Sequence, residues 1–209
     1  MPSNIKSASK IGGAVLIAAC IIFLGGCGAI KAQNPSQGYK PVNATPDEAG
    51  TPLMLKGYDV VSYFVANKDT VGSPQFKTNY KDIVFYFSSA ENKALFDKEP
   101  TKYLPEFGGY CANGIVYGIP WGGDGNTWKM IDGKLYIFGG QGSKDAFLID
   151  EKNNLTLANK YWKEEVDGNN SFWQRTKRTT FARVPHYKSG AELAKAVDEA
   201  KAKGLLPKA

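Results

Sequence analysis

Cys111 is the residue of this 209-residue chain with the clearest potential for chemistry. It lies in the segment Gly108-Gly109-Tyr110-Cys111-Ala112. An accessible thiol can act as a nucleophile, a redox group or a ligand contact, whereas a buried thiol is an inert packing group. Both interpretations stay open from the sequence. Cys20 and Cys27 belong to the N-terminal region, so the folded part has no second cysteine for an intramolecular disulfide. Cys111 could still be oxidised to a sulfenic acid, or form a mixed disulfide with the thiol of another molecule.

Five further residues are candidates for a ligand site, and each also has a structural interpretation. Gly109 permits backbone angles closed to other residues and the close approach of another group. Asp59 could orient a ligand or act as a base, or it could cap the helix that follows it. Aromatic side chains could line a pocket or build the core: Tyr58, Tyr110 and Trp128. The sequence assigns no catalytic residue.

Soft metal donors are few in the folded part. They are Met54, Cys111, Met130 and the single histidine, His186. A structural zinc needs four ligands, usually Cys or His, so the sequence predicts no metal site and no cofactor. A Cys-His-Met copper site is compatible with these ligand types, and copper or zinc therefore stays an open alternative. Without an evident carboxylate or serine partner, His186 is interpreted as structural or exposed.

The N-terminal segment predicts where the protein is located. Lys6 and Lys10 precede a 14-residue apolar run, Ile11 to Leu24, which ends at Leu24-Gly25-Gly26-Cys27. This order resembles a bacterial lipoprotein signal, with cleavage before Cys27, a diacylglycerol on its sulfur and an acyl chain on the new amino group. Two or three acyl chains hold a protein firmly on a membrane, whereas one binds marginally.

The predicted location is the cell envelope, as a membrane-anchored lipoprotein facing away from the cytoplasm. Gly28, rather than aspartate, follows the modified cysteine, which favours the outer membrane in a Gram-negative cell. An uncleaved membrane anchor is one alternative, although the apolar run is short for a membrane-spanning helix. Cleavage at Ile17-Ala18-Ala19-Cys20 is another, and it leaves too little apolar chain ahead of it.

Charge and composition limit the partners. Loss of the two lysines of residues 1–26 lowers the formal net charge from +6 to +4. This mild basicity favours anionic lipid or a cell-wall polymer, and the extracytoplasmic location argues against nucleic acid. Aromatic residues make up 12% of the chain, a rich supply for a core or for an aromatic-lined pocket. Residues 51–209 are long enough for one domain with its own core.

The predicted fold class is α+β, with a small antiparallel sheet of hairpins, interspersed short helices and a helical C-terminal region. The turns Lys81-Asp82 and Asp132-Gly133 indicate hairpins between Phe76–Tyr80 and Ile83–Phe87, and between Trp128–Ile131 and Lys134–Phe138. Ser88 and Glu91 match a capping box for a helix to Lys98, and Pro100 starts another short helix. Gly139–Lys144 lacks the spacing of a phosphate loop and is interpreted as a strand-to-helix turn. Further helices are predicted at Lys144–Ile149, Leu155–Val166, Ser171–Thr180 and Ala191–Lys203.

The chain divides into four predicted segments. They are a signal peptide (1–26), a lipidated flexible tether (27–50), a domain (51–168) and a helical C-terminal extension packed on that domain (169–209). The extension carries five basic residues interleaved with aromatic ones: Arg175, Lys177, Arg178, Arg183 and Lys188, with Phe172, Trp173 and Phe181. Such a stretch suits an amphipathic helix on the domain or at a membrane surface.

Several motifs in a fixed order resemble the YHS domain family. They are Gly57-Tyr58-Asp59-Val60-Val61-Ser62-Tyr63-Phe64, then Ile83 to Asn92, then Phe96, Pro100 and Tyr103. The continuation through Gly108–Ala112 and Trp128–Tyr136 resembles exported bacterial YHS proteins. The resemblance covers roughly residues 53–162.

The family is known for small metal-binding modules that use cysteines. This chain has Ser62, Ser88 and Asn92 where that variety has cysteines, and hydroxyls and amides are poor ligands for soft metals. The resemblance therefore implies a lipid-anchored, YHS-type ligand-binding module of the cell envelope without demonstrable catalysis. A thiol-based redox enzyme or sensor centred on Cys111 is the second hypothesis, and a copper- or zinc-handling protein is the third.

Overall fold

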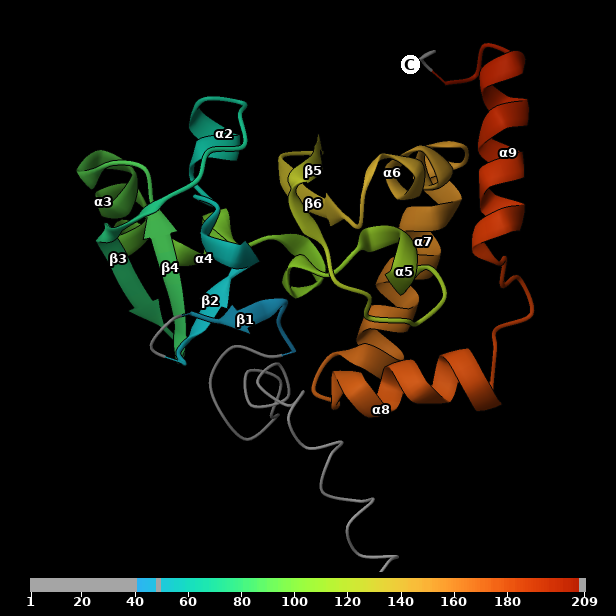
Figure 1. The fold of residues 1–209 in the computed structure, drawn as a ribbon, viewed down its shortest axis with the longest axis horizontal. Coiled ribbons are helices and arrows are strands. Elements are labelled where there is room, and N and C mark those ends of the chain that lie inside the picture. The colour runs from blue at the N-terminus through green and yellow to red at the C-terminus, as the bar shows by residue number, and fades with distance from the viewer. Residues whose placement is uncertain (1–40, 48–49, 207–209) are drawn as a thin grey trace, which may run out of the picture.

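Strands gather on one side of the molecule and the long helices on the other (Figure 1). The structure is a computed structural model, and it describes residues 41–47 and 50–206. The chain alternates short helices with hairpins as far as residue 138 and is helical from there on. The predicted α+β class is confirmed.

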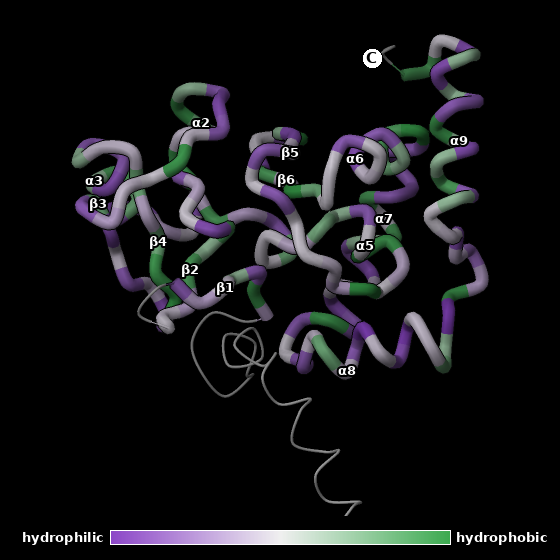
Figure 2. The backbone as a smooth tube through the Cα atoms, in the orientation of Figure 1, coloured by the Kyte–Doolittle hydropathy of each residue, from purple (hydrophilic) through white to green (hydrophobic). Residues whose placement is uncertain are grey.

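The larger sheet has four strands in the order β1-β2-β4-β3. Their bounds are Ala44–Pro46 (β1), Pro52–Met54 (β2), Ser73–Tyr80 (β3) and Ile83–Phe87 (β4). β1 pairs antiparallel with β2, and β3 pairs antiparallel with β4, but β2 runs parallel to β4 with Leu53 opposite Val84. β4 is almost wholly buried while β3 is an edge strand, and Figure 2 accordingly colours β4 as hydrophobic and β3 as mostly hydrophilic.

A separate two-stranded sheet follows, with β5 at Asp124–Ile131 and β6 at Lys134–Phe138. Both predicted hairpin turns are confirmed. Lys81 and Asp82 have φ of 51° and 64°, and Asp132 and Gly133 have φ of 51° and 74°. Two consecutive positive φ angles match the twist of the flanking strands, which is why Asp-Gly is a strong hairpin signal.

Helices occur throughout the chain, and the two longest of the described ones lie in its C-terminal part. Those before β5 are Ser62–Val65 (α2), Ala90–Lys98 (α3), Pro100–Tyr103 (α4) and Ala112–Ile115 (α5), with 3-10 turns at Leu55–Gly57 and Glu106–Gly109. The C-terminal helices are Gln141–Leu148 (α6), Glu151–Tyr161 (α7), Ser171–Thr176 (α8) and Gly190–Ala202 (α9). π-helical turns, Trp162–Val166 and Lys177–Phe181, extend α7 and α8.

The predicted cap of α3 is wrong by one residue. Ser89, not Ser88, is the N-cap, and its hydroxyl accepts a hydrogen bond from the Asn92 amide at 3.2 Å. Glu91 is then the second helical residue, so the Ser88–Glu91 capping box does not form. The Ser88 hydroxyl instead donates a hydrogen bond to the Asp59 carboxylate.

Three hydrophobic clusters make up the core. One joins the four-stranded sheet to β6 and contains Phe85, Phe87 and Phe96. A second, around Phe138 and Phe147, joins α5, β6, α6 and α7. The third packs α9 on α6 through Ala146, Val197, Ala200 and Leu206, and the ion pair Lys201–Asp145, at 2.7 Å, closes the same contact.

The interpretation of residues 27–50 as a flexible tether is wrong for residues 41–47. Val42 and Ala44 are buried, and β1 is hydrogen-bonded to β2. The Asn43 amide donates to the carbonyls of Gly109 at 3.0 Å and Gly123 at 2.9 Å, which fixes this segment to the domain. The signal peptide, Cys27 and residues 28–40 lie outside the described residues. Within the described ranges, no helix is long and apolar enough to cross a membrane.

Candidate functional site

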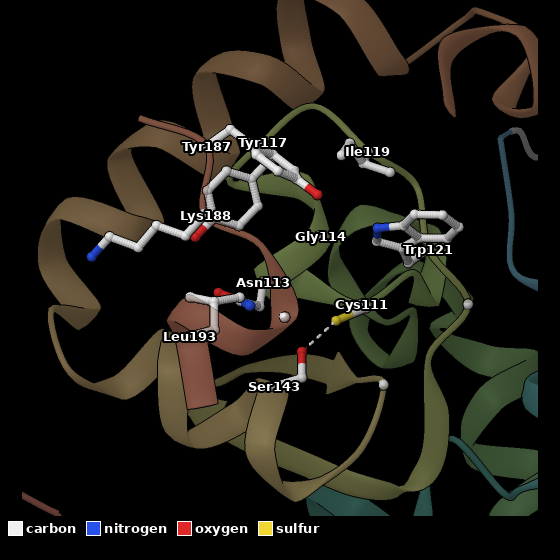
Figure 3. A pocket seen from close by; sticks show the side chains of 13 residues that line it. Cys111, Asn113, Gly114, Tyr117, Ile119, Trp121, Ser143, Tyr187, Lys188 and Leu193 are labelled. Atoms are coloured by element: carbon white, nitrogen blue, oxygen red, sulfur yellow. Dashed lines mark hydrogen bonds between the residues drawn. The ribbon is translucent and has the colours of Figure 1, made fainter. Parts of the chain in front are cut away.

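A pocket of about 260 Å³ lies beside Cys111 (Figure 3). Three parts of the chain line it. The segment 111–122 provides most of one side, the turn into α6 and its first residues provide Gly139 and Ser143, and the segment 187–193, which leads into α9, closes the other side. Aromatic and apolar walls surround a few polar groups, which is the usual make-up of a small-molecule site.

Backbone hydrogen bonds fold the 111–122 segment back on itself. The Cys111 amide donates to the Trp121 carbonyl at 2.9 Å, and the Ile119 amide donates to the Gly114 carbonyl at 3.0 Å. A Cβ on Gly114 would lie 2.6 Å from the Ile119 carbonyl oxygen, so only glycine permits this closure. The tight loop holds Cys111 and Trp121 on the same wall of the pocket.

The Cys111 thiol is buried but reaches the pocket. Its residue is 3% exposed, and its Sγ lies 3.0 Å from the Ser143 hydroxyl. Figure 3 shows this contact at the edge of the pocket. Gly139 lies against the same side chain, and a Cβ there would be in ordinary van der Waals contact with Cys111 Sγ at 3.7 Å. The Cys111 thiol and the Ser143 hydroxyl together form a polar site on a pocket wall that is otherwise mainly apolar.

Asn113 has a side-chain amide that faces this pocket without a protein partner among the described residues. The residue is 5% exposed and lines the pocket. Among the described residues, no group makes a hydrogen bond with its side chain, and it takes part in no other polar or charged contact. The polar atoms of this amide stay open to the pocket, since Arg175 Nε is the one buried side-chain nitrogen or oxygen of the described residues that lacks a partner. Water or a ligand in the pocket would satisfy it.

The electrostatics of the pocket favour a neutral or anionic ligand. Lys188 is one of its lining residues, and none of the described residues that line it is acidic. Burial raises the pKa of Tyr117, and the nearby Tyr187 and Glu192 raise it further. Tyr117 therefore stays a neutral aromatic wall, and the Lys188 ammonium is the one formal charge that these lining residues supply.

Tyr110 and Gly109, which were predicted as ligand contacts, serve the fold instead. Tyr110 is 1% exposed, and its hydroxyl contacts the Val42 carbonyl at 3.0 Å and the Ser171 hydroxyl at 2.8 Å. Burial raises the pKa of Tyr110, so this hydroxyl stays protonated. Gly109 does permit a close approach, with φ of 77°, but its neighbour is Leu55, which a Cβ would meet at 2.9 Å.

Tyr58 and Trp128 also lie outside the pocket. The Tyr58 ring packs against Gly125, where a Cβ would come within 2.4 Å of it. The Trp128 ring packs edge-on against Tyr63 with 5.1 Å between ring centroids, and its indole nitrogen donates to Asp69 at 3.4 Å. Of the six predicted ligand or redox residues, only Cys111 lines the pocket.

Asp59 is the centre of a buried hydrogen-bond cluster. Its Oδ1 accepts from the Val61 and Ser62 amides at 2.9 and 3.3 Å, so the predicted capping contact is present, although α2 begins only at Ser62. Its Oδ2 accepts from the Ser88 amide and hydroxyl at 2.8 and 2.6 Å and from the Asn92 side chain at 2.7 Å. These bonds tie the α2 turn to β4 and α3.

The positions that the YHS resemblance equates with metal-binding cysteines meet in this cluster. Ser62, Ser88 and Asn92 all hydrogen-bond Asp59. Here backbone amides, a hydroxyl and a side-chain amide all donate to one carboxylate, an arrangement that satisfies its lone pairs internally. The cluster therefore joins three elements, and nothing in its hydrogen bonding calls for a ligand.

The soft metal donors do not converge. His186 Nε2 contacts the Val116 carbonyl at 2.9 Å, and the ring stacks on Tyr117 at 5.7 Å. Met54 is buried in the core of the four-stranded sheet, and Met130 packs against the same cluster. In the part of the chain that the structure describes, no three His, Cys, Asp or Glu residues come together as a metal site.

Sequence reasoning missed most of the pocket. Gly139–Lys144 is the predicted strand-to-helix turn, but the same turn also delivers Ser143 to Cys111, 32 residues away. Asn113 stands two residues after Cys111 and has no sequence signal of its own. The remaining members that were missed line the walls: Tyr117, Ile119, Trp121, Tyr187, Lys188 and Leu193.

Comparisons of the chain with protein-family models, with curated proteins and with solved structures found no match.

Proposed function

We propose that this protein is a lipid-anchored, YHS-type ligand-binding module of the cell envelope, and that its ligand is a small amphiphilic molecule bound beside Cys111. The observation that carries the binding function is the Asn113 amide, which has no partner among the described residues and opens into the pocket beside Cys111. An open amide of this kind can exchange its water for a ligand that offers matching hydrogen bonds. The membrane anchor rests on the signal pattern that ends at Cys27.

The pocket lining specifies the chemistry of the ligand. Tyr117, Trp121 and Leu193 offer flat or apolar surface. The Asn113 amide both donates and accepts, while the Lys188 ammonium favours an anionic group. A ring system with one polar or acidic substituent matches this set of contacts. Binding needs no covalent step, and no residue has to act as an acid or base.

Filling the pocket mouth tests the proposal. Gly190 lines the pocket and has no atom within 4 Å of an added Cβ, so Gly190→Phe places a ring in the pocket region without a backbone clash. With 8-anilinonaphthalene-1-sulfonate, an aromatic sulfonate, as the probe, fluorescence titration is expected to show one saturable site in the wild type. Gly190→Phe is expected to weaken that site about tenfold or more, equivalent to roughly 1.4 kcal/mol.

Gly142→Phe is the matched control. Gly142 also lies in the first turn of a helix and has open space around its Cβ position, but it does not line the pocket. This variant should bind the probe as the wild type does. Equal probe affinity in the wild type and Gly190→Phe would show that the pocket beside Cys111 is not the binding site.

A thiol redox function is the second candidate, and one observation favours it: the Cys111 thiol lines the pocket within 3.0 Å of the Ser143 hydroxyl. A hydrogen-bonded thiolate that met a peroxide there would attack one oxygen, forming sulfenic acid and releasing water after protonation. A reactive sensor thiol is usually accessible, whereas Cys111 is 3% exposed. The binding module is therefore the leading proposal.

Alkylation kinetics separate the two functions. Iodoacetamide is expected to modify Cys111 at least about tenfold more slowly in the folded protein than in urea, because burial restricts access to the sulfur. Mass spectrometry of the modified peptide follows the rate. Rapid modification of the folded protein, together with dimedone labelling of Cys111 after peroxide treatment, would put the redox function first.

A further inference from the structure

Helix α8 and the π-helical turn after it present aromatic side chains outward. Phe172, Trp173 and Phe181 are 42%, 67% and 79% exposed, and the first two pack edge-on with 5.1 Å between ring centroids. These three residues are called the aromatic face below. Large exposed apolar side chains that gather on one element usually mark a contact surface.

The opposite side of this helix is polar, and it is the side that packs on the domain. The Gln174 amide donates to the Gly118 carbonyl at 2.9 Å, and Arg175 donates to the Pro120 carbonyl at 2.8 Å. Arg178 pairs with the Glu165 carboxylate. An ordinary surface helix buries its apolar side and exposes its polar side, and here the arrangement is reversed. Polar contacts thus hold the helix with its aromatic face turned outward.

The aromatic face begins beside the point at which the chain enters the domain. The Tyr110 hydroxyl contacts both the Val42 carbonyl, near the start of the described residues, and the Ser171 hydroxyl, at the first residue of α8. Figure 1 shows β1 and α8 along the same edge of the molecule. Fourteen residues, 27–40, connect Cys27 to position 41. A lipid on Cys27 would therefore keep the membrane near the side of the molecule where α8 starts.

We propose that the aromatic face inserts into the headgroup region of the membrane that carries the lipid anchor. This inference rests on the anchor of the proposed function. Tryptophan and phenylalanine suit the membrane–water interface, where an apolar ring is partly buried and its edge stays hydrated. Of the basic residues in the stretch 169–188, Arg175, Lys177 and Arg178 bond to Pro120 and Glu165 of the domain, so the contact with the membrane depends on the aromatic rings. The lipid surface thus orients the domain as well as retaining it.

Quenching of Trp173 by brominated phospholipids tests this contact. The complete chain is expressed in a bacterial host, and the protein that it yields is reconstituted into vesicles of phosphatidylcholine and phosphatidylglycerol, with bromine at a shallow position of the acyl chain. Subtracting the spectrum of Trp173→Phe isolates Trp173 from the other three tryptophans. The Trp173 emission is expected to fall by at least about half, because an interfacial ring lies near the bromine.

Two sets of variants control the experiment. Replacing both Phe172 and Phe181 with serine is expected to remove most of the quenching. The matched control replaces Val71 and Leu95 with serine, since these are exposed apolar residues of the sheet half of the molecule, and it should leave the quenching unchanged. If the protein floats with the vesicles but Trp173 stays unquenched, the membrane contact of the aromatic face is wrong and the lipid anchor stands. Protein that does not float with the vesicles overturns the lipid anchor and, with it, the inference.

Discussion

Asp59→Ala is expected to lower the free energy of unfolding by about 4 kcal/mol, because it deprives several buried donors of their acceptor at once. The residue is fully buried, and its carboxylate accepts five hydrogen bonds, from Val61, Ser62, Ser88 (two) and Asn92. The variant removes the connection between the α2 turn, the end of β4 and the start of α3. Urea unfolding followed by tryptophan fluorescence measures the difference.

The control for this measurement is Asp198→Ala. Asp198 is exposed on α9, so its replacement should change the free energy of unfolding by less than about 0.5 kcal/mol. Asp59→Asn keeps the volume but replaces one acceptor oxygen with a donor, and we expect it to lie between Ala and the wild type. A stable Asp59→Ala variant with altered probe binding would contradict the structural role and return Asp59 to the ligand site.

Asn113→Leu is expected to have little effect on stability and a large effect on binding. The amide has no protein partner among the described residues and its polar atoms open into the pocket, so an apolar replacement of similar volume should change the free energy of unfolding by less than about 1 kcal/mol. Removal of the amide donor is expected to weaken binding of the aromatic sulfonate probe about tenfold. Urea unfolding and the probe titration are carried out on the same preparation.

Asn126→Leu provides the comparison, because Asn126 lies on the exposed surface of β5 and does not line this pocket. It should alter neither stability nor probe affinity by more than the error of the measurements. Destabilisation of Asn113→Leu by more than about 1 kcal/mol would mean that the amide supports the fold. Unchanged probe affinity would mean that it does not meet the ligand.

Asp59 and Asn113 show how differently buried polar residues are used. The hydrogen bonds of Asp59 are satisfied within the protein, and such a group contributes to stability. The amide of Asn113 has no protein partner among the described residues and opens into the pocket, where water or a ligand can pair with it. The sequence offered Asp59 as a helix cap or a ligand contact and did not indicate Asn113, and the distribution of hydrogen-bond partners separates the two roles.

Local features of the fold could be predicted from the sequence. The turns at Lys81-Asp82 and Asp132-Gly133, the helix that starts at Pro100 and the alternation of hairpins and helices were all foreseen. Each depends on backbone preferences of a few adjacent residues, so a short window of sequence contains the information. The signal pattern ending at Cys27 is equally local, and it stays a prediction about location.

Only the tertiary structure shows which residues come together to form the pocket. Ser143 reaches Cys111 across 32 residues, and the segment 187–193 completes a wall with residues that begin at position 111. The outward orientation of Trp173 depends likewise on polar contacts with distant carbonyls such as that of Gly118, 56 residues from Gln174. Whether an amide is paired, a thiol is buried or an aromatic ring is exposed depends on what packs against it. Those neighbours are distant in sequence, so residue type and spacing could single out Cys111 but could not identify the residues around it.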